Sequence, residues 1–203
     1  MKKSVSIKGL YCIIDSAEKV EQACKGGADI IQLRLKDISE REFFFIAKKT
    51  KEIIDKYNVL FLINDRLDIA LLVGADGVHL GQKDLPAKEI KKKFREFVVG
   101  VSTHSVSEAV EAQKNGADYI SVGPIFKSPT KPELTPVGLE LLKEIKQKVR
   151  IPVVAIGGIN EKNIEIVKKT KVDSIAVISA ISKSKNIELA VRKLKNKFLW
   201  TKI

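Results

Sequence analysis

Two aspartates that follow neighbouring apolar runs are the residues whose types and spacing best suit chemistry. The run 59–63 leads directly into Asn64 and Asp65, and the run 77–80 is followed closely by Asp84. If both runs are parallel strands joined by a right-handed helical crossover, the two carboxylates emerge at one edge of a sheet. Carboxylate and amide oxygens suit Mg²⁺, which usually completes its coordination with water and substrate phosphate. Acids after strands also serve as helix N-caps or loop residues, and the pattern alone leaves that alternative open.

A second group of polar residues follows an earlier apolar run. Gln32, Arg34 and Lys36 alternate with leucines, so a strand through this segment would direct all three inward and toward the end of the sheet. Polar groups on an inward face are costly unless an anion or a hydrogen-bonding ligand meets them. Two cations here therefore favour a phosphate-bearing substrate. The alternative is an ordinary strand end whose cations extend into solvent.

An imidazole and several hydroxyl groups occupy equivalent positions later in the chain. His79 lies between apolar neighbours, which fits either a hydrogen-bonded core histidine or a ligand contact. Ser102 belongs to a small, hydroxyl-rich segment that can donate hydrogen bonds to phosphate oxygens. These positions add candidate donors to the same predicted edge.

A long proline-containing loop, 123–138, follows the sixth predicted strand. It contains Ser128, Thr130 and Lys131, which supply two hydroxyls and a positive charge. Long loops within compact domains often cover or form binding sites. A lysine that closes over the site would balance the charge of a diphosphate.

Eight strands alternating with helices are predicted to position these residues. A Gly-Ala-Asp pattern at 27–29, 74–76 and 116–118, repeated without its glycine at 171–173, places a helix end and a tight turn before a strand. The predicted strands are 10–14, 30–33, 59–63, 77–80, 98–101, 119–122, 153–156 and 174–177. Their apolar character on both faces favours a parallel sheet covered by helices.

Eight such units close most simply into a single α/β domain, a (β/α)₈ TIM barrel spanning 1–203. An open doubly wound sheet is the alternative, but the first strand is not followed by a Gly-x-Gly-x-x-Gly motif. In a barrel, function lies at the C-terminal ends of the strands, and phosphate usually binds after strands seven and eight. There the chain has Gly158, Ile178 and Ser179. Glycine allows the backbone to approach a ligand closely, so a phosphate site is expected at these loops.

Composition limits the possible partners. The net charge of +12 comes mainly from lysines dispersed over helical segments, which are chiefly solvated faces but can also attract an anionic substrate. Dispersed cations without an aromatic platform argue against nucleic-acid binding.

Cys12 and Cys24 are expected to be free, buried thiols. Neither a signal peptide nor a membrane-spanning run is evident, so a cytoplasmic protein without membrane partners is expected, and its oligomeric state is not indicated.

Seven separated motifs resemble those of the thiamine-phosphate synthase family, also called thiamine-phosphate pyrophosphorylase, over about 10–181. They are 32–36, 64–66, 75–84, 100–104, 123–131, 155–159 and 178–181. The resemblance implies a TIM-barrel enzyme that joins hydroxymethylpyrimidine diphosphate to a thiazole phosphate, either the carboxylate or the alcohol. The products would be thiamine phosphate and pyrophosphate.

The resemblance also implies residue roles. Asp65 and Asp84 would hold Mg²⁺, and Gln32 and His79 would face the pyrimidine. The diphosphate would be bound by Arg34, Lys36, Asn64, Ser102 and Lys131, of which all but Asn64 are the expected catalytic residues. The thiazole phosphate would be bound by Ser128, Thr130, Gly158, Ile178 and Ser179. Such groups would stabilise the negative charge of departing pyrophosphate, without a protein nucleophile or general base.

Two other functions remain open on the same scaffold. The related thiazole tautomerase shares the barrel and the phosphate-binding loops, but its better-known members carry a histidine where this chain has Pro124. Without that base, proton transfer lacks its usual agent. The other possibility is a non-catalytic sensor of a phosphorylated ligand, because a fold does not dictate function.

Overall fold

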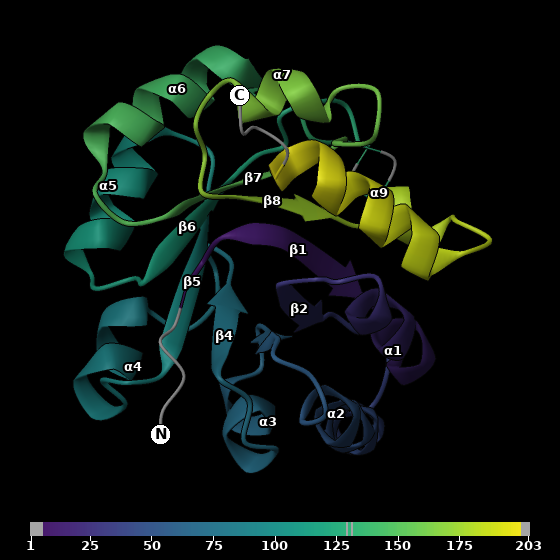
Figure 1. Ribbon diagram of the computed structural model, residues 1–203. Helices are drawn as coiled ribbons and strands as arrows, with labels where there is room; N and C mark the ends of the chain where they lie inside the picture. Colours follow the sequence, from purple (N-terminus) through teal and green to yellow (C-terminus); the bar gives the residue numbers. More distant parts are fainter. Residues whose placement is uncertain (1–5, 129, 131, 200–203) are drawn as a thin grey trace.

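The computed structural model describes residues 6–128, 130 and 132–199. Within them, eight parallel strands close into a barrel in which β1 pairs with both β2 and β8 (Figure 1). The strands are β1 (Gly9–Ile14), β2 (Ile30–Leu33), β3 (Leu60–Asn64), β4 (Gly77–Leu80), β5 (Val98–Thr103), β6 (Tyr119–Val122), β7 (Val153–Ile156) and β8 (Ser174–Val177). The predicted (β/α)₈ barrel is confirmed.

Helices surround the strands on the outside of the barrel (Figure 1). They are α1 (Ala17–Lys25), α2 (Glu40–Ile54), α3 (Leu67–Leu72), α4 (Ala87–Lys93), α5 (Val106–Lys114), α6 (Gly138–Lys148), α7 (Ile164–Lys168), α8 (Ser179–Ser182) and α9 (Ile187–Leu199). Apolar positions at helical spacing explain their packing: Phe43, Ala47 and Ile54 form the buried stripe of α2. None of the helices within the described residues has the length and apolar character needed to span a bilayer.

Two apolar layers meet at the strands. The outer layer packs strand side chains such as Cys12 and Ile31 against the helices, whereas the inner layer fills the barrel with side chains such as Leu62 and Val154. Cys12 and Cys24 are free and buried, as expected. The inner layer is packed, so the middle of the barrel has no room for a ligand.

The repeated turn before each even-numbered strand has a common structure. Gly27, Gly74 and Gly116 have φ values of 91°, 67° and 81°, and Lys171 adopts φ of 59° in the copy without glycine. The aspartate of each copy accepts a hydrogen bond from a backbone N–H of the preceding strand. The pairs are Leu10 with Asp29 at 2.9 Å, Phe61 with Asp76 at 2.7 Å, Val99 with Asp118 at 2.7 Å and Val153 with Asp173 at 2.8 Å. These bonds tie together the N-terminal ends of the strands.

Strand ends near the predicted site differ from expectation. β2 ends at Leu33, the last residue paired with β1 and β3, as predicted, so no strand continues the alternation of Gln32 and Arg34 as far as Lys36. β3 includes Asn64, and β5 continues to Thr103 because Ser102 and Thr103 still pair with β6. Asn64 and Ser102 are therefore held by the sheet, whereas Lys36 lies beyond it.

Candidate active site

One cavity at the C-terminal ends of the strands brings together most of the predicted site residues. Ten of them line it: Gln32, Arg34, Asn64, His79, Ser102, Ser128, Thr130, Gly158, Ile178 and Ser179. They come from strands or the loops that follow them, except Ser179, which is the first residue of α8. Lys131 is outside the described residues.

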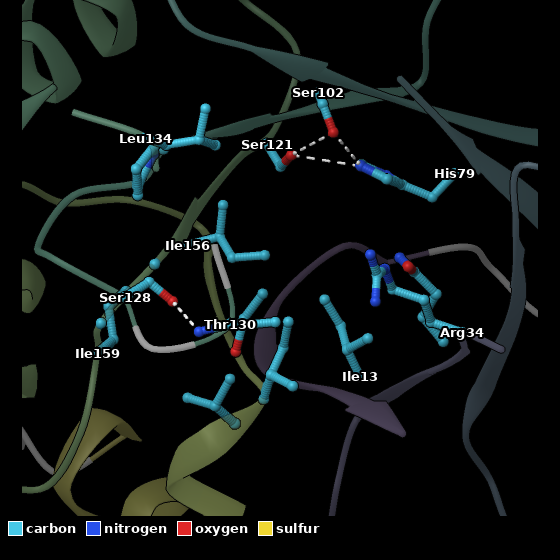
Figure 2. A pocket seen from close by; sticks show the side chains of 18 of the residues that line it. Ile13, Arg34, His79, Ser102, Ser121, Ser128, Thr130, Leu134, Ile156 and Ile159 are labelled. Atoms are coloured by element: carbon cyan, nitrogen blue, oxygen red, sulfur yellow. Dashed lines mark hydrogen bonds between the residues drawn. The ribbon is translucent and has the colours of Figure 1, made fainter. Parts of the chain in front are cut away.

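The polar groups of the cavity lie on separate sides (Figure 2). His79, Ser102 and Ser121 form one cluster, with His79 Nε2 at 2.9 Å from Ser102 Oγ. Ser128 and Thr130 lie elsewhere in the cavity, and the Thr130 N–H donates to Ser128 Oγ at 3.3 Å. The cavity can therefore receive a ligand with polar groups at both ends.

Asp65 and Asp84 lie next to each other beside this cavity. Lys36 Nζ contacts Asp65 Oδ2 at 2.7 Å, and the Gly81 N–H donates to Asp84 Oδ2 at 2.6 Å. Desolvation raises the pKa of Asp84, the Gly81 N–H opposes this effect, and the negative charge of Asp65 raises the pKa further. Two carboxylates that disfavour each other's charge suit a cation between them.

The backbone at Asp65 is also unusual. Its φ of 61° lies in the left-handed region, where few residues other than glycine are found. Such conformations persist where the surrounding structure holds them and are frequent at functional sites. No group of three or more histidine, cysteine or acidic side chains that could hold a metal occurs among the described residues. A metal at Asp65 and Asp84 would therefore need further oxygen ligands from water or substrate.

A buried row of hydrogen-bonding side chains lies beneath the cavity. His79 is only 7% exposed, and its Nδ1 is 2.8 Å from the hydroxyl of Tyr119. Tyr119 contacts the hydroxyl of Tyr11 at 3.0 Å, and Tyr11 in turn accepts a hydrogen bond from Gln32 Nε2. Burial raises the pKa of both phenols, so each keeps its proton at neutral pH. His79 is thus both a core histidine and a residue of the cavity wall.

Sequence reasoning missed both tyrosines of this row, as well as Ser121. The available signal was Gly100, which is paired with Tyr119 across β5 and β6. A Cβ atom at Gly100 would lie 2.1 Å from Cζ of Tyr119, so the glycine makes room for the ring. His104 also lines the cavity, but it is an exposed residue whose Nδ1 is 3.1 Å from Glu108.

Comparisons with known proteins agree on one family. The family model described as thiamine monophosphate synthase matches residues 10–181. The thiamine-phosphate synthase of Clostridium novyi (strain NT) is 51% identical over 182 residues, covering 89% of this chain and 89% of that protein. The enzyme of the same description from Clostridium tetani (strain Massachusetts / E88) is 48% identical over 181 residues, covering 89% and 87%. A solved structure of thiamine phosphate pyrophosphorylase from Pyrococcus furiosus has a TM-score of 0.88 and 41% identity, covering 94% of this chain and 95% of that chain.

Proposed function

The chain belongs to the thiamine monophosphate synthase family and is a transferase of thiamine biosynthesis, and we propose that it joins hydroxymethylpyrimidine diphosphate to a thiazole phosphate. The products are thiamine phosphate and pyrophosphate. The observation that carries this proposal is the gathering of diphosphate-type and phosphate-type donors around one cavity. Both substrates can then bind at once, with their reacting atoms between the two groups.

The diphosphate binds on the side of Arg34, Asn64 and Ser102. Arg34 supplies a permanent positive charge, and the other two supply an amide and a hydroxyl. Lys36 lies nearby through its contact with Asp65. These groups favour the reaction because they stabilise the negative charge that grows on pyrophosphate as the bond to carbon breaks.

Asp65 and Asp84 are the residues that would hold Mg²⁺. The raised pKa of Asp84 and the proximity of Asp65 fit a site that is completed by a cation. Bound there, Mg²⁺ would add positive charge beside the leaving pyrophosphate. Lys36 pairs with Asp65 and can also contact the diphosphate, so it links the metal-binding aspartates to the diphosphate-binding residues.

The thiazole phosphate binds in the part of the cavity formed by the segments that follow β6, β7 and β8. Ser128, Thr130 and Ser179 provide hydroxyls, while Gly158 and Ile178 complete the wall. Hydroxyl and backbone N–H donors at the loops after the last strands are the usual phosphate ligands of TIM barrels.

The chemistry needs little from the protein beyond charge stabilisation and positioning. Departure of pyrophosphate leaves a pyrimidinylmethyl cation, which the thiazole nitrogen then attacks. Neither step requires a protein nucleophile. Cys12 packs between the barrel and its helices, away from the cavity, and burial raises the pKa of its thiol.

The test is turnover with purified protein, hydroxymethylpyrimidine diphosphate, thiazole phosphate and Mg²⁺. Release of one pyrophosphate for each thiamine phosphate formed is expected. Isomerisation of the thiazole carboxylate phosphate without pyrophosphate would instead indicate a tautomerase, although Pro124 lines the cavity where that enzyme's histidine is expected. Tight binding of the thiazole phosphate without either product would indicate a sensor.

A further inference from the structure

We propose that Tyr11 and Tyr119 are positioning residues that orient Gln32 and His79 toward the pyrimidine through one directional chain of hydrogen bonds. This inference rests on the proposed function, because it concerns how the same cavity recognises its pyrimidine substrate. The two phenols lie under the cavity and do not line it. They act on the substrate only through the side chains that they hold.

The chain of hydrogen bonds crosses the barrel from one wall to the other. It runs from Gln32 on β2 through Tyr11 on β1 and Tyr119 on β6 to His79 on β4, and it ends at Ser102 on β5. The first four residues are each at most 7% exposed. Water therefore cannot readily replace a missing partner, and each group depends on the next.

The donor at the first link gives the chain a direction. Gln32 donates an N–H to the Tyr11 oxygen. Either hydroxyl could donate between Tyr11 and Tyr119, and we assign the donor role to Tyr11, because its buried O–H then has Tyr119 as its acceptor. Tyr119 then donates to Nδ1 of His79, at 2.8 Å. An unprotonated Nδ1 places the proton of the neutral imidazole on Nε2, which is 2.9 Å from Ser102 Oγ.

This direction determines which groups face the substrate. Gln32 uses an N–H beneath the cavity, so its carbonyl oxygen remains to accept a hydrogen bond from a ligand. Ser102 accepts from His79, so its own O–H remains to donate. The Gln32 acceptor suits the amino N–H of an aminopyrimidine, and the Ser102 O–H can donate to the diphosphate of the same substrate. In a pyrimidine with a carbonyl in place of the amine, the carbonyl oxygen would face the carbonyl oxygen of Gln32. Both are acceptors, so no hydrogen bond could form between them.

The phenols are well suited to keep this direction constant. Both retain their protons at neutral pH because they are buried. The rings of Tyr119 and His79 stack with centroids 5.5 Å apart, and the rings of Tyr11 and Tyr119 meet edge to face at 6.2 Å. Gly100 leaves the space that the Tyr119 ring occupies. Packing thus restricts each ring to a position from which its hydroxyl reaches the next partner.

The direct test is the tautomer of His79, measured by nitrogen NMR on ¹⁵N-histidine-labelled protein. The chain has two histidines, so a His104→Gln variant assigns the signals. We expect a protonated Nε2 and an unprotonated Nδ1 in the native protein. Tyr119→Phe, which removes only the hydroxyl, should give a mixture of tautomers. Tyr57→Phe, a change at the remaining tyrosine outside the barrel interior, should leave the native tautomer.

Steady-state kinetics provide the second readout. Tyr11→Phe and Tyr119→Phe should each raise KM for the pyrimidine diphosphate by about tenfold, the effect of one lost hydrogen bond. KM for the thiazole phosphate should change by less than about twofold, because a different part of the cavity binds it. A general loss of packing would weaken both substrates.

The outcomes separate this inference from the proposed function. A protonated Nδ1 of His79 in the native protein would reverse the direction of the hydrogen-bond chain. That result would overturn the inference, whatever the activity of the protein. Equal KM changes for both substrates would also overturn it. If pyrophosphate is not released at all, the proposed function fails, but the NMR result still reports the direction of the chain. If Tyr119→Phe does not fold, the native tautomer and Tyr11→Phe decide.

Discussion

At the scale of single residues, Asp65 and Asp84 gain their chemical character from each other. Each is an ordinary acid in the sequence, but their proximity disfavours two negative charges without a cation. Asp65 is also held at a positive φ. The structure therefore maintains a local arrangement that is unfavourable on its own, as is common where a ligand later supplies the compensation.

Asp84→Asn should weaken Mg²⁺ binding and remove Mg²⁺-dependent turnover. Loss of a residue that only supports a metal ligand typically costs about 10–100-fold in affinity, so a direct ligand should cost at least about tenfold. Titration calorimetry with Mg²⁺ and bound pyrophosphate measures this. Asp68→Asn is the matched control, because Asp68 lies in α3 and pairs with Arg66. Unchanged affinity in Asp84→Asn would remove the metal assignment.

The same substitution should change stability with pH in the metal-free protein. A carboxylate whose pKa is raised by folding contributes stability below its unfolded-state pKa, and this is lost as pH rises through the folded-state pKa. At neutral pH, Asp84→Asn should therefore melt at a higher temperature than the native protein. Toward about pH 4 the difference should shrink. Thermal unfolding without metal at both pH values checks the sign, and a lower melting temperature at neutral pH would contradict it.

At the scale of elements, the turn before each even-numbered strand is a repeated unit that can be tested in its exceptional copy. Three copies use glycine at a positive φ, and the fourth uses Lys171 at 59°. The left-handed conformation costs a residue with a side chain about 1–2 kcal/mol, whereas glycine loses roughly 0.5–1 kcal/mol through greater freedom in the unfolded chain. The local conformation should thus favour glycine at this position.

Lys171→Gly should stabilise the protein by about 0.5–1 kcal/mol, or roughly 1–4 °C in melting temperature. Differential scanning calorimetry measures the change. The matched control is Lys169→Gly, because Lys169 has φ of −61° at the end of α7 and gains nothing from a left-handed preference. That control should lose stability by about 0.5–1 kcal/mol. Destabilisation by Lys171→Gly would mean that contacts of the lysine outweigh its backbone cost.

At the scale of the whole molecule, the two ends of the barrel have different tasks. The N-terminal end carries the four aspartates that accept strand N–H groups, and Lys91 contacts one of them, Asp118, at 2.9 Å. The candidate site lies at the C-terminal end. Substitutions at the first end should therefore affect stability, and those at the second end should affect binding and turnover.

Asp118→Ala should lower stability by about 1–3 kcal/mol, because it leaves the Val99 N–H and the Lys91 ammonium without their carboxylate. The expected fall in melting temperature is about 2–4 °C for each kcal/mol. Both KM values should remain unchanged at a temperature where the variant is folded. Asp55→Ala, at an exposed pair with Lys51, should change stability by less than about 0.5 kcal/mol. A change of either KM in Asp118→Ala would contradict this separation, because it would show that the N-terminal end of the barrel also affects substrate binding.

The sequence by itself determined the number, order and approximate bounds of the strands. Apolar runs, helical spacing and the Gly-Ala-Asp turns are local signals, and strands 30–33, 77–80, 119–122, 153–156 and 174–177 were predicted with the bounds observed. Once the barrel is assumed, its topology places the strand ends together, so ten cavity residues could be identified from their positions along the chain.

Only the tertiary structure decided which side chains meet inside the barrel. Tyr11 and Tyr119 are 108 positions apart and read as ordinary strand residues, yet barrel closure brings their hydroxyls to 3.0 Å. The missing side chain of Gly100 then lets the Tyr119 ring lie against His79. The pairing of Lys36 with Asp65 likewise depends on register and closure. Periodicity predicts the face of each strand, but contacts across the barrel arise from the register of all eight strands together.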